Sequence, residues 1–232
     1  MSANKTPKFT LFDVDHTLID SGGAGIIALN RTLEEMTGIS NGFKGISVAG
    51  KTDMQIVREA MEKFALGPDD GMVPRFLNRY LVHLRGAMTQ NNGRVKPGVK
   101  ALLTRLQNQA HFRLGLLTGN IEQGARIKLA PFSLNRFFPV GAYGSDGEDR
   151  NHLLPIAVER LAQAGGVLVG YSRCIVIGDT PRDVQCAEIH GAASIAVATG
   201  PFSVEDLRQT GADLVLADLS ETDEIVRWME NR

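Results

Sequence analysis

Short apolar runs recur along the chain, and longer amphipathic stretches separate them. The runs carry no polar alternation, which is typical of strands buried on both faces of a parallel sheet. Between them, apolar residues recur at helical spacing over 98–109 and 151–163. This alternation predicts an α/β fold with a doubly wound, Rossmann-like parallel sheet. The predicted strands are Phe9–Val14, Arg113–Leu117, Phe137–Tyr143, Cys174–Ile177, Ser194–Ala198 and Leu214–Ala217.

The segment from about Asp20 to Asn92 interrupts this rhythm. It contains no convincing strand, but three of its stretches, around 26–36, 56–64 and 76–84, place apolar residues on one helical face. A polar, turn-forming stretch at 90–93 ends the segment. We therefore expect two domains: an α/β core formed by residues 1–19 and 93–232, and an inserted helical cap formed by residues 20–92.

Composition narrows the range of partners. The 232 residues include 25 Lys and Arg against 26 Asp and Glu, a formal net charge of −1, so no general positive field holds nucleic acid or an anionic membrane surface. The N-terminus lacks the apolar core of a signal peptide, and no apolar run approaches the roughly 20 residues of a membrane helix. We expect a cytoplasmic protein that binds neither nucleic acid nor membrane. Cys174 and Cys186 are expected to be buried thiols rather than a disulfide.

The strongest chemical signal, Phe12-Asp13-Val14-Asp15-His16-Thr17, directly follows the first predicted strand. Ligand sites of open α/β sheets lie at the carboxyl ends of strands, and extended backbone through Val14 would point Asp13 and Asp15 to one side. Two carboxylates at such a short separation repel each other, so they need a shared proton or a cation between them. An ionised Asp13 can attack phosphorus, while Asp15 can protonate a leaving oxygen and later deprotonate water. The same residues are also compatible with a non-catalytic alternative, in which the strand ends in a turn and both acids are solvated.

Later strand ends supply partners for these acids. Thr118-Gly119-Asn120 places a hydroxyl, a glycine and an amide before a helix, where they can bind a phosphate oxygen, although a simple capped loop has the same composition. Gly178-Asp179-Thr180-Pro181-Arg182-Asp183 follows another predicted strand. A helix that starts with a capping box explains its threonine, its proline and its second acid, but leaves Asp179 unexplained. Asp179 facing Asp13 would complete an oxygen site for Mg²⁺.

These motifs resemble those of the haloacid dehalogenase superfamily, with Asp-x-Asp-x-Thr at 13–17, Thr118 as the second motif and Gly-Asp-x-x-x-Asp at 178–183. Nearly the whole chain is similar to the branch that carries a cap after the first motif, and within it to phosphoglycolate phosphatase-like enzymes. The resemblance implies an aspartyl-phosphate intermediate, with Asp13 as nucleophile and Asp15 as acid/base. It also implies Mg²⁺ held by the carboxylates of Asp13 and Asp179 and the backbone carbonyl of Asp15, with Asp183 nearby or acting through water. The expected activity is Mg²⁺-dependent hydrolysis of a small phosphorylated metabolite, such as phosphoglycolate or a similar compound.

One position departs from the family pattern. The family usually supplies a lysine between the second and last motifs, and Arg150 occupies that place here. A guanidinium can bind phosphate through two hydrogen bonds where lysine offers a point charge. A cation at the start of a helix gains nothing from the helix dipole, so Arg150 needs another explanation. We expect Arg150 to bind the phosphate together with Thr118, Gly119 and Asn120, and Lys128 is the alternative.

The segment 45–52, Gly-Ile-Ser-Val-Ala-Gly-Lys-Thr, matches the P-loop pattern letter for letter, and a true P-loop would indicate a nucleotide-binding protein such as a nucleotide hydrolase or a kinase. A P-loop must follow a buried strand and open a helix, and residues 41–44 (Asn-Gly-Phe-Lys) cannot form that strand. We therefore interpret the match as accidental and the segment as a cap loop. In this loop Gly50 precedes Lys51, which could enter the closed site and favour substrates that bear a second anion. An ordinary solvated lysine is equally compatible with the sequence.

Two other functions share parts of this pattern. A phosphomutase has the same core and differs in how the cap returns the intermediate. A non-catalytic, receiver-like module also places acids at strand ends, but Thr17, Asn120 and the cap argue against it, because such a module needs no lid to exclude water.

Overall fold

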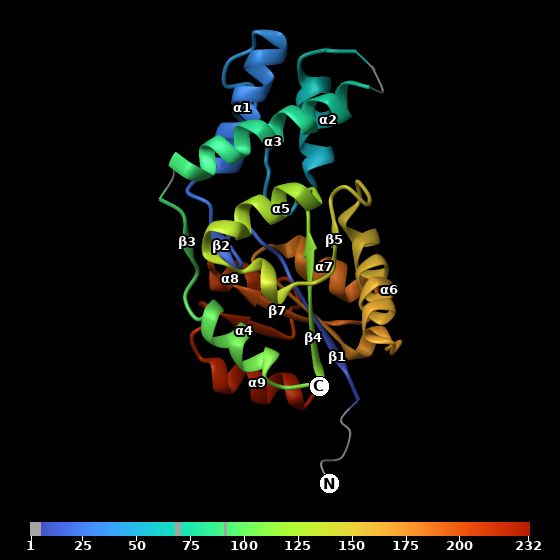
Figure 1. The fold of residues 1–232 in the computed structure, drawn as a ribbon. Coiled ribbons are helices and arrows are strands. Elements are labelled where there is room, and N and C mark those ends of the chain that lie inside the picture. The colour runs from blue at the N-terminus through green and yellow to red at the C-terminus, as the bar shows by residue number, and fades with distance from the viewer. Residues whose placement is uncertain (1–5, 68–70, 91) are drawn as a thin grey trace.

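The computed structural model describes residues 6–67, 71–90 and 92–232. In it, six parallel strands form one sheet in the order β5-β4-β1-β6-β7-β8 (Figure 1). The strand order reverses beside β1, which pairs with β4 on one side and with β6 on the other. The predicted doubly wound α/β sheet is confirmed. Its strands are β1 (Lys8–Phe12), β4 (Phe112–Thr118), β5 (Gly141–Tyr143), β6 (Cys174–Gly178), β7 (Ala193–Val197) and β8 (Leu214–Leu216).

Helices cover both faces of this sheet. One face packs against α4 (Val99–Gln107), α5 (Glu122–Leu129) and α9 (Thr222–Glu230), the other against α6 (Leu153–Gly165) and α7 (Pro181–Ile189), and α8 (Val204–Arg208) covers the β7–β8 edge. All five residues of β1 are buried, with Phe9 and Leu11 packed on the α6 side and Phe12 on the α4 side. A strand buried on both faces needs no polar alternation, so the continuous apolar runs mark this sheet in the sequence.

Three further helices lie beyond the carboxyl ends of β1 and β4 and make up what we call the three-helix segment (Figure 1). They are α1 (Ala24–Thr37), α2 (Asp53–Lys63) and α3 (Met72–Gln90). Their apolar faces meet in a separate cluster around Leu33, Phe76 and Leu84, which Ile121 joins from the other side. The helices fall inside the expected insert, and its bounds at residues 20 and 92 stay a prediction.

A short ladder closes the base of the three-helix segment. β2 (Ile19–Asp20) and β3 (Arg94–Val95) pair antiparallel, with Ile19 opposite Val95 and Asp20 opposite Arg94. Strands of two residues are too short to show a hydrophobic period, so they could not be predicted from the sequence. The ladder ties together the two points where the chain leaves the sheet and returns to it.

The predicted strand Phe137–Tyr143 is only partly correct. Strand pairing starts at Gly141, and Asn135–Phe137 forms a 3₁₀ turn instead. Phe137 and Phe138 are buried in the α4-side core from this irregular segment, so their hydrophobicity reflects packing rather than a strand. Pro139 has no N–H to donate to a ladder, which favours a later start. The other 3₁₀ turns are Ala130–Phe132, Arg150–His152 and Tyr171–Arg173.

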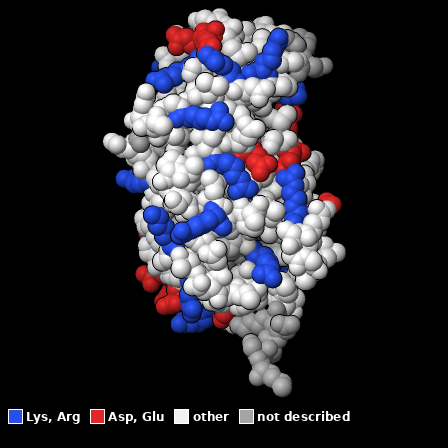
Figure 2. Space-filling view, in the orientation of Figure 1, with Lys and Arg blue, Asp and Glu red and all other residues white. Residues whose placement is uncertain are grey.

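The cysteines, the helix lengths and the surface charge can each be compared with what the sequence predicted. Cys174 and Cys186 are free and buried, as predicted. No helix in the described ranges is long and apolar enough to cross a membrane. On the face shown in Figure 2, Lys and Arg side chains are spread over the surface rather than gathered in one patch, and acids lie beside several of them.

Candidate active site

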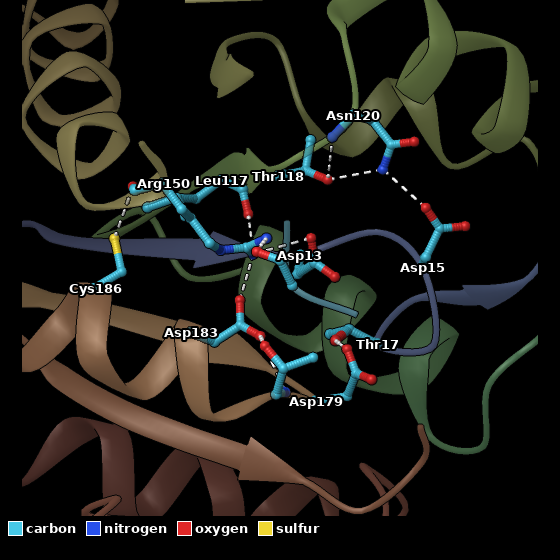
Figure 3. Close-up of polar contacts among 12 residues, drawn as sticks. Asp13, Asp15, Thr17, Leu117, Thr118, Asn120, Arg150, Asp179, Asp183 and Cys186 are labelled. Atoms are coloured by element: carbon cyan, nitrogen blue, oxygen red, sulfur yellow. Dashed lines mark hydrogen bonds and ion pairs between the residues drawn. The ribbon is translucent and has the colours of Figure 1, made fainter. Parts of the chain in front are cut away.

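The carboxyl ends of β4, β1 and β6 lie side by side and carry Thr118, Asp13 and Asp179 (Figure 3). The N–H of Asp13 donates to the carbonyl of Ile177 at 2.9 Å, which extends the pairing with β6 one residue past the end of β1. Asp13 is 6% exposed. Adjacent parallel strands end at the same edge of a sheet, and this explains how residues more than a hundred positions apart meet here.

Asp15 has a different set of partners from Asp13. The assigned strand ends at Phe12 rather than continuing through Val14, and the chain then turns back, with His16 at a positive φ of 58°. The Asp15 carboxylate accepts hydrogen bonds from Asn120 Nδ2 at 2.8 Å and from Lys128 Nζ at 2.6 Å. Burial acts to raise the pKa of Asp15, but Lys128 and then Asn120 outweigh burial and lower that pKa. The contacts on the side that faces α5 therefore favour the carboxylate form of Asp15.

Arg150 lies directly on Asp13. Its guanidinium is 5% exposed and donates to Asp13 Oδ1 at 3.1 Å, to the carbonyl of Leu117 at 3.2 Å and to Asp183. Burial raises the pKa of Asp13 to about 6, and Arg150 opposes that rise. The residue expected to bind phosphate thus lies at the expected nucleophile, while Lys128, the alternative, lies at Asp15.

Asp179 carries an unsatisfied oxygen inside the site. Its Oδ1 accepts a hydrogen bond from the Thr17 hydroxyl at 3.3 Å, but its buried Oδ2 has no hydrogen-bond partner. A Cβ on Gly200 would lie 1.8 Å from this Oδ2, so only glycine leaves room for the carboxylate there. Burial, followed by repulsion from Asp13 and Asp183, raises the pKa of Asp179. An unpaired buried carboxylate oxygen facing another acid is the environment that a cation relieves.

Asp183 supports the site from the start of α7. Its Oδ2 accepts from the N–H and the hydroxyl of Thr180, at 3.0 and 2.7 Å, and closes the predicted capping box. Its Oδ1 accepts from Arg150. Both oxygens of Asp183 are therefore occupied, and the side chain fixes Arg150 against Asp13.

The acidic groups of the site are suitable oxygen ligands for Mg²⁺, the ion that the family resemblance implies. Within the described ranges, no three Asp, Glu, His or Cys side chains form a group that could hold a metal ion. Mg²⁺ binds through one or two carboxylates and keeps other positions for water and substrate oxygens. The carboxylates of Asp13 and Asp179 meet that requirement, and the unpaired Oδ2 of Asp179 is the observation that favours it.

The loop before α2 and the first residue of that helix contact residues beside those expected to bind phosphate. The N–H of Asp53 donates to the carbonyl of Gly119 at 2.7 Å, and the Asp53 carboxylate accepts from the N–H of Ile121 at 2.8 Å. The Thr52 hydroxyl donates to the carbonyl of Glu148 at 2.9 Å. A Cβ on residue 119 would lie 2.1 Å from the carbonyl of Lys51, so Gly119 permits the contact.

Asp53 was not among the residues expected at the site. Thr52 caps α2 and Asp53 follows in its first turn. This pattern is common at helix starts, so the sequence does not indicate that Asp53 also contacts Ile121. Burial raises the pKa of Asp53 to about 6. Its contact with Ile121 depends on how the three-helix segment meets α5, which the sequence does not show.

Lys51 lines the site, but its ammonium points to a neighbour on α2. Nζ lies 2.7 and 2.6 Å from the two carboxylate oxygens of Glu59. The segment 45–52 is an irregular loop between α1 and α2 and follows no strand, which agrees with the interpretation of its P-loop pattern as accidental. The role of Lys51 toward a second anion stays a prediction.

A cavity of about 560 Å³ lies between the sheet edge and the three-helix segment. From the sheet side it is lined by the acids Asp13, Asp15 and Asp179, with Asn120 and Arg150. The three-helix segment contributes mainly apolar side chains to the opposite wall. A closed, charged end joined to an apolar end is the arrangement of a small-molecule site.

Known proteins resemble this chain over most of its length. The haloacid dehalogenase-like hydrolase family model matches residues 10–197. The chain is 27% identical over 201 residues to a phosphoglycolate phosphatase of Xanthomonas campestris, and the match covers 84% of each protein. It is 29% identical over 225 residues to a phosphoglycolate phosphatase of Rhodospirillum rubrum, which covers 92% of this chain and 88% of that protein. Among solved structures, CbbY from Rhodobacter sphaeroides in complex with phosphate matches with a TM-score of 0.73 at 18% identity, over 93% of this chain and 96% of that one, and it supports the fold.

Proposed function

The chain belongs to the haloacid dehalogenase-like hydrolase family, and we propose that it is a Mg²⁺-dependent phosphatase of small phosphate monoesters that works through an aspartyl-phosphate intermediate. The observation that carries the proposal is the buried group at the closed end of the cavity. Asp13 lies there against Arg150, beside an Asp179 whose Oδ2 is unpaired. The two phosphoglycolate phosphatases that resemble this chain make phosphoglycolate one candidate substrate.

The phosphoryl group needs positive and hydrogen-bonding partners around Asp13. Arg150 supplies the cation, and Thr118, Gly119 and Asn120 supply a hydroxyl, a backbone N–H and an amide at the end of β4. When bound, Mg²⁺ would neutralise phosphate oxygens and polarise phosphorus. Asp13, Asp179 and the backbone carbonyl of Asp15 would hold it, and Asp183 would keep Arg150 in place.

The reaction has two halves. In the first, an Asp13 oxygen attacks phosphorus, the bond from phosphorus to the ester oxygen breaks, and that oxygen takes a proton from Asp15. In the second, Asp15 takes a proton from water, the water oxygen attacks phosphorus, and the acyl phosphate on Asp13 is cleaved. The contacts with Lys128 and Asn120 favour the carboxylate of Asp15, which suits the second half.

The three-helix segment would act as the cap. Its loop reaches the carbonyl of Gly119 through Asp53 and the carbonyl of Glu148 through Thr52, so the site is covered in the arrangement that the structure shows. Exclusion of water strengthens each charge interaction inside a site. We expect the cap to open for substrate entry and product release.

Hydrolysis of a generic aryl phosphate with Mg²⁺, with EDTA and with an Asp13→Asn variant tests the proposal. We expect turnover only for the wild type with Mg²⁺, with inorganic phosphate as a product. Turnover that survives EDTA or the loss of the Asp13 carboxylate would remove the metal or the nucleophile from the mechanism. Formation of an isomeric phosphate ester instead of inorganic phosphate would indicate a phosphomutase.

A further inference from the structure

Aliphatic side chains gather on the cavity wall opposite the acids, where the polar Ser47, Lys51 and Asp53 also lie. Five of its side chains, all from the three-helix segment or its loop, are aliphatic: Ile26, Leu29, Val48, Ala49 and Ile56. Two of them, Ile26 and Val48, are 37% and 41% exposed. Large apolar side chains gathered at the wall of a cavity mark a ligand surface.

Each permanently charged basic side chain along the described cavity wall already has an acidic partner. Lys51 contacts both carboxylate oxygens of Glu59, and its side chain is only 13% exposed. Lys128 lies 2.6 Å from Asp15. Arg150 contacts Asp13 and Asp183, and in the proposed reaction it binds the phosphoryl group.

His16 is the remaining basic side chain of the wall. It directly follows Asp15 in the chain, on the sheet side of the cavity. Asp53 adds a further acid to the wall. A second anion on the substrate would therefore enter a space in which Lys51, Lys128 and Arg150 are each paired with an acid and in which acids lie on the sheet side. Burial of a charge without a partner is strongly unfavourable.

The size of the space points the same way. A cavity of about 560 Å³ has room for more than a phosphate and a two-carbon acid, because pockets of roughly 300–1,000 Å³ hold drug-sized ligands. Aliphatic side chains line part of that space.

From these observations, and on the basis of the proposed phosphatase function, we propose that the alcohol portion of the substrate is an uncharged apolar group of several carbons, which lies against Ile26, Val48 and Ile56. This differs from the carboxylate-bearing alcohol that the names of the relatives suggest. It also differs from the second-anion preference predicted for Lys51.

A series of esters measures this preference in the wild-type enzyme with Mg²⁺. We expect kcat/KM to rise from methyl to ethyl, butyl and hexyl phosphate by up to about fourfold per buried methylene. Phosphoglycolate should be at least about tenfold poorer than ethyl phosphate, which has a methyl group in place of the unpaired carboxylate. A preference for phosphoglycolate over ethyl phosphate would overturn the inference while leaving the phosphatase function intact. Failure to hydrolyse any ester, including an aryl phosphate, would instead overturn the phosphatase function itself.

Two neighbouring residues of α1 provide a matched pair of variants. Ile26 and Ile27 are both 37% exposed, but only Ile26 lines the cavity. Ile26→Ala should lower kcat/KM for hexyl phosphate by about tenfold, with a much smaller loss for methyl phosphate, whereas Ile27→Ala should behave like the wild type. Equal effects of the two substitutions would show that the alcohol portion does not contact this wall.

Glu59→Gln tests why the enzyme disfavours a second anion. Loss of the Glu59 charge frees Lys51, so kcat/KM for phosphoglycolate should rise by about tenfold or more, and Lys51→Ala in the same chain should abolish that gain. Glu62→Gln, on an exposed position of the same helix, is the control and should leave the substrate ratio unchanged. If Lys51→Ala alone lowers phosphoglycolate turnover selectively in the otherwise wild-type enzyme, Lys51 already binds a substrate anion and the proposal is wrong.

Discussion

Arg150 is the residue whose replacement tests the electrostatics of the site most directly. Its buried guanidinium contacts Asp13 and Asp183 at once, and it also donates to the carbonyls of Leu117 and Gly50. Glutamine is shorter and uncharged, so Arg150→Gln leaves two buried carboxylates without their cation. We expect a loss of stability as well as a loss of phosphate binding.

The size of the loss follows from the burial of the groups involved. Removal of one partner from a buried ion pair costs about 3–5 kcal/mol, because the remaining charge stays buried without compensation. Burial already raises the pKa of Asp13 to about 6 while Arg150 opposes the rise, so the variant raises that pKa further. A carboxyl group with a raised pKa in the folded state stabilises the fold at low pH, and this contribution is lost as pH rises through the folded-state pKa. The variant should therefore lose more stability relative to wild type at pH 8 than at pH 5.5.

Urea unfolding in EDTA measures this difference without a contribution from bound metal. At pH 8 we expect Arg150→Gln to be less stable by about 3–5 kcal/mol, and at pH 5.5 the gap should narrow by at least about 1 kcal/mol. Arg208→Gln, which removes one partner of an exposed pair with Glu205, should change little at either pH. A gap that is small, or equal at the two pH values, would refute the interpretation of Arg150 as the cation that compensates buried Asp13 and Asp183.

Four further substitutions address the other roles. Asp13→Asn should abolish turnover and leave the fold intact, since an amide is not a nucleophile; circular dichroism and a phosphate-release assay check both parts. Asp179→Asn should raise the Mg²⁺ concentration needed for half-maximal activity, because it removes a ligand charge, and an unchanged requirement would exclude Asp179 as a ligand. Lys128→Met should lower kcat more than it raises KM, because Lys128 contacts Asp15 rather than Asp13. Asp53→Asn keeps an acceptor for the Ile121 N–H, and since burial raises the pKa of Asp53 to about 6, wild type should lose about 2 kcal/mol relative to this variant between pH 4 and pH 7 in urea unfolding.

The strand ends could be predicted because each strand of a parallel sheet can be recognised from a few neighbouring residues. Continuous apolar runs before Asp13, Thr118 and Asp179 identify buried strands, and adjacent parallel strands bring their carboxyl ends to one edge. The capping box of α7 was equally visible, since Thr180 and Asp183 lie three residues apart. In each case the information lies within a few residues of the position concerned.

The partners of Asp15 and Asp53 were not predictable in the same way. Lys128 lies on α5 and Asp53 at the start of α2, and each contact depends on how helices from different parts of the chain pack. The residue types at these positions fit ordinary helix starts and ends, so nothing local distinguishes them. Phe137 and Phe138 show the converse problem, because side chains buried from an irregular segment resemble a strand in the sequence.

Hydrogen bonds also connect the loop before α2 with the groups proposed to bind phosphate. Arg150 donates from one side of its guanidinium to Asp13 and from the other to the carbonyl of Gly50 in the cap loop. Gly119, beside Thr118, accepts the N–H of Asp53 from the same loop. An outward movement of the three-helix segment therefore breaks hydrogen bonds made by the groups proposed to bind phosphate. Because each of these groups is shared between the loop and the sheet edge, we expect closure of the proposed cap and assembly of the proposed phosphoryl site to occur as one event rather than two.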